Sequence, residues 1–175
     1  MADAKQRGDP AYDNFELRDS PFFLIARVSG RYVLDMEMVL KTIDMDMPGW
    51  RTLMIVRERE PSSVSEIADL AVMRLSTMTR VVQRLKRRGL VRINSRPSDA
   101  RKTDVYLTLK GKDMMQRVRL VASGVYDAAF RGISASDINQ LNDLLRRMFE
   151  NLAMTADLAD GVPARGRRVS SCRRR

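Results

Sequence analysis

The chain has 175 residues, with 32 lysines and arginines, 22 aspartates and glutamates, no histidine and a single cysteine. Its length, its 44% hydrophobic content and its 31% charged content are typical of one globular domain with extensions. Without histidine and with one cysteine, zinc-finger ligand sets, an internal disulfide and histidine-based catalytic triads are excluded. There is also no Gly-rich phosphate loop and no nucleophile elbow. We therefore expect no enzyme activity, no cofactor and no metal.

The longest apolar run, residues 22–26, is far shorter than the roughly 20 residues that cross a bilayer. The polar N-terminus lacks the apolar segment of a secretory signal. We therefore expect a cytoplasmic protein without a membrane partner.

The net charge of +10 is concentrated in one part of the chain. Residues 74–112 contain twelve basic and two acidic residues, and the stretch from Gly161 adds six arginines and no acid. A basic block in an otherwise acidic protein indicates a polyanionic partner, most often nucleic acid. The alternative, a solvated charged face, is less favoured because the charge continues through a predicted helix, strand and loop.

The N-terminal third predicts an arm and two helices. Residues 1–19 have weak periodicity, so we expect an extended arm. Ser20 and Pro21 are helix start signals, and a long first helix is expected to end near Asp44. Its apolar stripe comprises Phe22, Ile25, Val28, Tyr32, Met36, Val39 and Ile43. Pro48 and Gly49 are expected to interrupt the chain before a short second helix, which contains Trp50, Leu53, Met54 and Val56 and stops before Pro61.

The middle of the chain predicts two further helices and a hairpin. Ser63 and Glu66 have capping-box spacing and begin a third helix. A fourth helix has an apolar stripe of Leu75, Met78, Val82 and Leu85, with Val81 beside it, and ends at Gly89. Beyond Gly89 the period changes to two, which predicts strands at residues 90–94 and 103–107 around a basic turn at 95–100.

The last third predicts two more helices and a tail. Thr108 is expected to cap a fifth helix, and Ser134 with Asp137 a sixth. The sixth helix carries a heptad-like seam that is wider than a solitary surface helix needs, and this predicts a dimer interface. The seam comprises Ile138, Leu141, Leu145, Met148 and Leu152. The Arg-rich residues 161–175 predict a disordered tail.

Two short helices followed by a basic hairpin form the layout of a winged helix-turn-helix. The fourth helix has an apolar back and a polar front, as a helix that enters the major groove needs. The DNA-binding candidates on and just before this helix are Arg74, Ser76, Thr77, Thr79, Arg80, Gln83 and Arg84. At the hairpin tip, Arg96, Arg101 and Lys102 are expected to reach the DNA backbone or the minor groove.

The sequence is similar to the MarR family of bacterial transcriptional regulators over roughly residues 20–157. The similarity rests on residues 64–68, 79–91 and above all 99–108 with Gly111, which resemble the family's wing signature. It implies a homodimer in which the first, fifth and sixth helices interlock, and it implies that Arg101 enters the minor groove, steadied by Asp99. Arg74 stands where the family often has a small polar cap, and Lys86 replaces a common acid.

The resemblance also implies an effector pocket where the first, second and fifth helices meet the dimer interface. Phe22, Phe23, Trp50, Arg27 and Arg51 are the candidates for binding an anionic aromatic compound there. The alternative for each is core packing of the aromatic ring or solvent exposure of the arginine. A redox role for Cys172 is less favoured than that of a lone exposed cysteine.

The sequence therefore predicts a mainly α protein with a small β-hairpin wing. The expected division is an arm at 1–19, an N-terminal dimerisation helix at 20–47, a winged lobe at 48–112, C-terminal dimerisation helices at 113–160 and a tail at 161–175. The expected function is a dimeric repressor released from a palindromic operator by a small anionic effector, such as an aromatic acid or its CoA thioester. The alternative is an architectural DNA-binding protein, and a ratio of specific to nonspecific affinity of about 10³ or more distinguishes the repressor.

Overall fold

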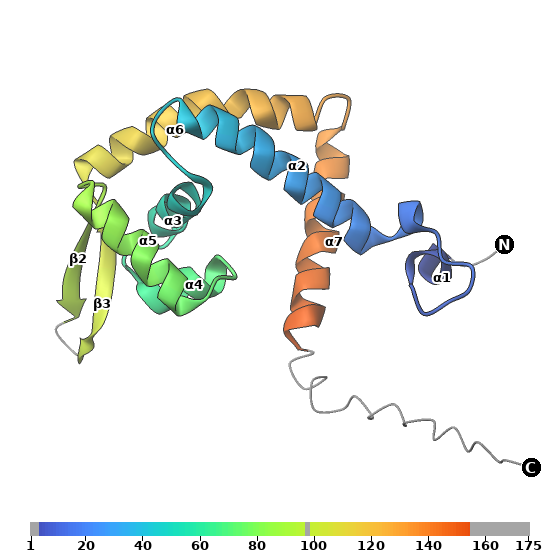
Figure 1. Cartoon of the computed structure of the whole chain (residues 1–175), viewed down its shortest axis with the longest axis horizontal. Helices are drawn as coiled ribbons and strands as arrows, with labels where there is room; N and C mark the ends of the chain where they lie inside the picture. The colour runs from blue at the N-terminus through green and yellow to red at the C-terminus, as the bar shows by residue number, and fades with distance from the viewer. Residues whose placement is uncertain (1–3, 97–98, 155–175) are drawn as a thin grey trace, which may run out of the picture. The chain divides into compact units, whose positions relative to one another are not determined.

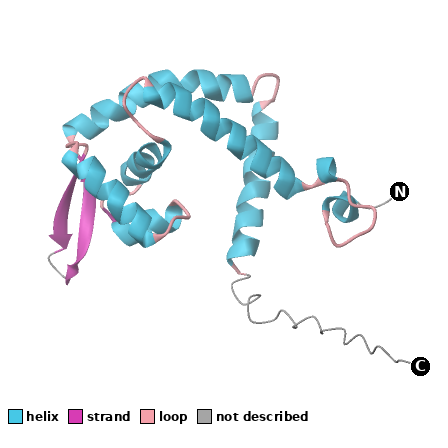
Figure 2. Cartoon of the chain, viewed as in Figure 1, coloured by secondary structure: helices cyan, strands magenta, loops and turns pink. Residues whose placement is uncertain are grey.

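The computed structural model describes residues 4–96 and 99–154, with only the backbone for residue 96 and residues 99–102. In chain order the elements are α1 (Ala4–Gly8), η1 (Leu17–Asp19), α2 (Pro21–Lys41), α3 (Met47–Glu58), β1 (Ser62–Ser63), α4 (Val64–Leu70), α5 (Leu75–Arg87), β2 (Val91–Arg96), β3 (Asp99–Leu107), α6 (Leu109–Ala129) and α7 (Ala135–Ala153) (Figure 1). The protein is mainly helical with one small antiparallel sheet (Figure 2), which confirms the predicted fold class. It divides into two compact units, one up to Ala129 and one from Phe130.

The prediction of an extended N-terminal arm was wrong for residues 4–19. This segment contains α1 and η1, and it is folded back on itself by contacts between residues far apart in its sequence. Arg7 Nε donates to Asp19 Oδ2 at 2.7 Å, and the backbone nitrogen of Glu16 donates to the carbonyl of Arg7 at 2.9 Å. Such contacts leave no periodic pattern, so they could not be predicted from the sequence.

The boundary between α2 and α3 also differs from the prediction. Ser20 occupies the N-cap position of α2, but its side chain makes no capping hydrogen bond. The helix ends at Lys41, and α3 already begins at Met47 because Asp46 caps it: Asp46 Oδ1 accepts from the backbone nitrogen of Gly49 at 2.9 Å. Pro48 therefore lies in the first turn of α3, where the ring fits the helix, and does not interrupt the chain.

The hydrophobic core of the first unit lies inside the winged lobe and reaches the C-terminal part of α2. Its fully buried side chains come from α2, α3, α4, α5, the sheet and α6, and include Met36, Leu40, Leu53, Val56, Ile67, Met78, Val82, Leu85, Leu90, Val105 and Val118. The predicted stripe on α2 is therefore buried only in its second half. Phe22, Ile25, Val28 and Tyr32 in the first half are exposed.

The sheet has the strand order β1-β3-β2, with all neighbours antiparallel. The predicted hairpin is present and longer than expected, from Val91 paired with Leu107 to Arg96 paired with Asp99. The third strand, β1, was not predicted, and its Ser62 pairs with Val105 of β3. Next to β1, the side-chain Oε1 atom of Glu60 accepts a hydrogen bond from the backbone nitrogen of Leu107 at 2.9 Å. This edge ties the start of α4 to the base of the wing.

The second unit contains α7, whose start was predicted correctly. The backbone nitrogen of Asp137 donates to Ser134 Oγ at 3.2 Å, and the backbone nitrogen of Ser134 donates to Asp137 Oδ2 at 3.3 Å, which completes a capping box. Across the described part of the chain, none of the helices is both long enough and apolar enough to span a membrane.

Candidate nucleic-acid interface

Helices α4 and α5 form the helix-turn-helix, and hydrogen bonds fix the start of α4 and the turn that follows it. The predicted capping box begins α4: the backbone nitrogen of Ser63 donates to Glu66 Oε2 at 2.6 Å, and that of Glu66 donates to Ser63 Oγ at 3.2 Å. Within the turn, the backbone nitrogen of Met73 donates to the carbonyl of Ala68 at 2.9 Å. Arg74 occupies the N-cap position of α5 without a capping side-chain hydrogen bond. The geometry of α5 is therefore set by the turn and by packing.

The apolar face of α5 seats this helix in the lobe. Met78, Val82 and Leu85 are fully buried, and Val81 is almost fully buried beside them. Leu75 was predicted to share this face but is 54% exposed, because it is the first residue of the helix and precedes the part that packs on the lobe. The buried face thus begins one turn later than predicted.

The opposite face of α5 carries the polar side chains that sequence reasoning assigned to DNA. Ser76, Thr77, Arg80 and Gln83 are all exposed, and at 100° per residue they share one side of the helix. Arg87 is exposed on the same side, one turn beyond Gln83. It was missed, although its spacing of seven from Arg80 was visible in the sequence.

Two other predicted contacts of α5 are engaged within the protein. The hydroxyl of Thr79 donates to the carbonyl of Leu75 at 2.8 Å, although Thr79 itself is exposed. Arg84 Nη2 donates to Asp46 Oδ1 at 2.8 Å and lies 2.6 Å from Asp46 Oδ2. The Arg84 guanidinium is thus paired in this structure with a carboxylate 38 residues earlier in the chain. Its contact with DNA stays a prediction.

The base of the wing is held against the end of α5. Thr108 Oγ1 donates to the carbonyl of Gly89 at 2.6 Å and accepts from the backbone nitrogen of Gly111 at 3.0 Å. Lys110 Nζ donates to the carbonyl of Arg88 at 3.0 Å, where a cation complements the C-terminal end of the helix dipole. Lys110 is therefore a helix-capping residue in addition to being part of the basic block.

Further out on the wing, the guanidinium of Arg92 lies 4.1 Å from the ring centroid of Tyr106, its cross-strand neighbour. Arg92 is exposed, so this stacking presents one more oriented cation on the wing. The side chains predicted at the tip, Arg96, Asp99, Arg101 and Lys102, lie outside the described residues, as do residues 161–175 with Cys172.

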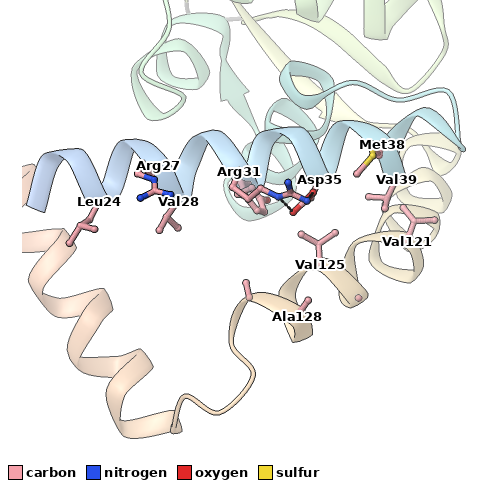
Figure 3. Close-up of a pocket in the computed structure, with 13 residues that line it drawn as sticks. Leu24, Arg27, Val28, Arg31, Asp35, Met38, Val39, Val121, Val125 and Ala128 are labelled. Atoms are coloured by element: carbon pink, nitrogen blue, oxygen red, sulfur yellow. Dashed lines mark hydrogen bonds and ion pairs between the residues drawn. The ribbon is translucent and has the colours of Figure 1, made fainter. Parts of the chain in front are cut away.

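The five predicted effector residues do not line one cavity. A groove of about 750 Å³ runs between α2 and α6 and is lined by Arg27 together with Leu24, Val28, Arg31, Tyr32, Asp35, Met38, Val39, Val121 and Val125, among others (Figure 3). Trp50 instead lines a second cavity of about 520 Å³. Phe22, Phe23 and Arg51 line neither. Spacing along two helices does not show which turns face each other, so the sequence alone does not predict which residues share a cavity.

The second cavity combines an apolar wall with charged residues. Its lining includes Trp50, Met54, Ile55, Leu70 and Met115, with Arg57, Glu58 and Arg59 around them. The Trp50 Nε1 atom is buried and has no hydrogen-bond partner among the described residues.

The residues of the seam predicted for dimerisation are exposed or half-buried in the single chain. Leu141, Leu145 and Leu152 on α7 are exposed, while Ile138 and Met148 are half-buried. Leu144 and Phe149, which flank the seam, are exposed as well.

Comparison with known proteins gives matches to one family by sequence and by structure. The model of the MarR family matches residues 45–103. The HTH-type transcriptional repressor IacR of Pseudomonas putida is 42% identical over 144 residues, which cover 82% of this chain and 86% of IacR. CouR from Rhodococcus jostii RHA1, solved with p-coumaroyl-CoA, has a TM-score of 0.70 and 24% identity, over 76% of this chain and 94% of CouR. A MarR variant from E. coli, solved with operator DNA, has a TM-score of 0.65 and 21% identity, over 71% of this chain and 90% of that chain.

Proposed function

Because this chain belongs to the MarR family of winged helix-turn-helix transcriptional regulators, we propose that it is a repressor that binds a palindromic operator as a homodimer and is released by a small anionic compound. The observation that carries the proposal is the division of α5 into two faces. One face is buried in the lobe through Met78, Val82 and Leu85, and the other presents Ser76, Thr77, Arg80 and Gln83 to solvent.

The exposed face of α5 has the chemistry that base recognition in the major groove needs. Arg80 can donate two hydrogen bonds to a guanine edge, and Gln83 can pair with an adenine edge, while Ser76 and Thr77 suit bases or phosphates. Because α5 is held rigidly by the lobe, these side chains reach DNA without a large ordering cost. The wing adds Arg92 and, as sequence similarity implies, Arg101 with Asp99.

The proposed dimer is supported by two exposed apolar surfaces. One lies on the first half of α2 with Phe22, Ile25 and Val28, and the other is the α7 seam. A monomer that leaves this much apolar surface in water is unusual, and a second copy is the simplest partner. A two-fold symmetric dimer presents two copies of α5, so the operator is expected to be a palindrome with half-sites about one helical turn apart.

For the effector we propose the cavity lined by Trp50 and Met115. Its volume of about 520 Å³ is suited to an aromatic compound, since ligand cavities of roughly 300 to 1,000 Å³ are usual. Arg57 and Arg59 provide positive charge for a carboxylate or for the phosphates of a CoA thioester. The effector can release the operator only to the extent that it binds the DNA-incompetent form more tightly than the competent form.

The test of DNA recognition is selection of bound sequences from random duplex DNA, followed by titration at fixed salt. We expect a palindromic site and a ratio of specific to nonspecific affinity of about 10³ or more. Arg80→Ala is expected to lose the preference for the selected site over nonspecific DNA. Arg146→Ala, which removes one positive charge from α7 instead, is expected to keep that preference. A ratio near one for the unaltered protein would instead support the architectural alternative.

The test of the effector is a thermal-shift screen of aromatic acids and their CoA thioesters. Compounds that stabilise the protein are then added to the operator complex. Release that is lost in a Trp50→Ala variant which still binds the operator would place the effector in this cavity, while unchanged release would contradict this location.

A further inference from the structure

The turn between α2 and α3 places two carboxylates against the recognition helix α5. Asp46 Oδ1 accepts from Arg84 Nη2 at 2.8 Å and also from the backbone nitrogen of Gly49 at 2.9 Å. Asp44 Oδ2 lies 2.9 Å from Arg88 Nη2, which also donates to the Asp44 backbone carbonyl. The two arginines are one helical turn apart, so Asp46 contacts the last turn of α5 and Asp44 contacts its C-cap residue.

These pairs change the charge that α5 presents to DNA. At 100° per residue, Arg84 lies on the exposed side of α5, between Arg80 and Thr77. Its side chain is about two-fifths exposed, so it is within reach of solvent and of an approaching phosphate. A phosphate and the carboxylate of Asp46 are both anions with hydrogen-bonding oxygens, and they compete for the same guanidinium.

We propose that Asp46 acts as an internal substitute for a DNA phosphate. Its carboxylate occupies the Arg84 guanidinium, keeps it from binding the phosphates of the DNA backbone, and thereby lowers the affinity of the protein for DNA of any sequence. This inference rests on the proposed DNA-binding function. It assigns Asp46 to the specificity of the regulator, because a lower nonspecific affinity raises the ratio of specific to nonspecific binding. Asp44 acts in the same way on Arg88, though more weakly, since Arg88 is also held by the Asp44 carbonyl.

The alternative is that Asp46 orients Arg84 to read a base. An end-on contact from arginine to guanine uses both terminal nitrogens of the guanidinium. One of them, Nη2, already faces both oxygens of Asp46, at 2.8 Å and 2.6 Å. The geometry therefore favours withholding Arg84 over presenting it.

The decisive variant is Asp46→Asn. Asparagine caps a helix as well as aspartate does, so the hydrogen bond from Gly49 and the start of α3 are retained while the charge is removed. The matched control is Asp143→Asn, which breaks the exposed 2.6 Å pair with Arg146 on α7 and changes the net charge equally. The double variant Asp46→Asn with Arg84→Ala removes both charges of the ion pair and leaves the net charge of the protein unchanged.

The measurement is the affinity of each full-length dimer for a labelled random-sequence duplex between 50 and 200 mM salt. Each new phosphate contact steepens the slope of log affinity against log salt by about 0.9, or about 1.8 for the two protomers. Asp46→Asn is thus expected to bind more tightly at low salt, with an advantage that shrinks about twelvefold by 200 mM. Asp143→Asn and the double variant are expected to keep the original slope.

The outcomes separate this proposal from the function on which it rests. If the unaltered protein binds DNA and Asp46→Asn behaves like Asp143→Asn, Asp46 does not mask Arg84. Weaker binding of Asp46→Asn to the selected operator, with unchanged binding to random DNA, would also overturn the proposal and make Asp46 a positioning residue. Absence of DNA binding by the unaltered protein would instead reject the proposed function.

A second variant covers the case in which Asp46→Asn unfolds the lobe. Asp44 has a φ of 55°, a conformation that asparagine tolerates well, so Asp44→Asn is expected to fold. It frees Arg88 from the carboxylate and is expected to steepen the same slope by a smaller amount. An unchanged slope for this variant would contradict the proposal that the carboxylates of this turn keep the arginines from DNA phosphates.

Discussion

Gly111 gives the sharpest prediction about how the wing is held. It lies in the first turn of α6, and a Cβ atom built there would be 2.1 Å from the carbonyl oxygen of Leu90 and 3.3 Å from Leu107 Cδ2. That carbonyl cannot swing away freely, because it accepts from the backbone nitrogen of Thr108 at 3.1 Å. Gly111→Ala therefore forces the start of α6 away from the base of the wing.

Two opposing effects decide how much Gly111→Ala changes the free energy of unfolding. Replacing glycine by alanine inside a helix normally stabilises by about 1 kcal/mol. Against this, overpacking costs about 1 to 3 kcal/mol or more, and weakening the hydrogen bond at Leu90 costs about 1 kcal/mol. The clash is with backbone, so we expect the upper part of this range and a net loss of about 2 to 3 kcal/mol. For a protein of this size that lowers the unfolding temperature by roughly 5 to 10 °C.

The assay is thermal unfolding followed by circular dichroism at one fixed protein concentration, since dimerisation makes the midpoint depend on concentration. Gly30→Ala is the matched control: it also lies inside a helix, α2, and a Cβ there meets nothing within 4 Å. Gly30→Ala is expected to raise the midpoint or leave it unchanged. An equal or higher midpoint for Gly111→Ala would refute the packing argument.

Three further predictions concern DNA and assembly. Arg101→Ala is expected to weaken operator binding about ten- to a hundredfold in a titration at fixed salt, because a charge-assisted contact in the minor groove is lost. Gln83→Ala is expected to relax the preference at one base position per half-site by about 1 to 3 kcal/mol, visible as one flattened position in the selected sequences. Replacing Leu145 and Met148 by aspartate is expected to abolish the dimer in sedimentation, since buried charges would face each other across the seam.

Local patterns in the sequence predicted most of the fold. The capping boxes at Ser63 and Ser134 and the terminating Gly89 depend on residues no more than a few positions apart, and each appears where expected. The strand β1 is only two residues long, too short to show an alternating pattern, and it forms because β3 offers an edge. Its existence depends on a partner more than forty residues away.

The candidate site was predicted less completely for the same reason. The apolar and polar positions of α5 follow helical periodicity, so its two faces were visible in the sequence. The pairing of Arg84 with Asp46 joins two residues separated by 38 positions, and no spacing rule connects them. Trp50 and Arg27 were grouped by residue type, whereas the fold puts them in the linings of different cavities. Tertiary contacts, which local patterns do not contain, decided each of these cases.

Burial along α2 leads to a last prediction that separates folding from assembly. Met36 is 1% exposed in the core, whereas Val28, two turns earlier on the same helix, is 70% exposed in the groove shown in Figure 3. If that groove meets a second copy, Val28→Asp buries a charge only in the dimer, at a cost of several kcal/mol that the two-fold symmetry doubles. We expect a folded monomer with unchanged helical content, while Met36→Asp unfolds the lobe. Sedimentation together with circular dichroism distinguishes the two variants. A Val28→Asp protein that stays dimeric would show that this part of α2 lies outside the interface.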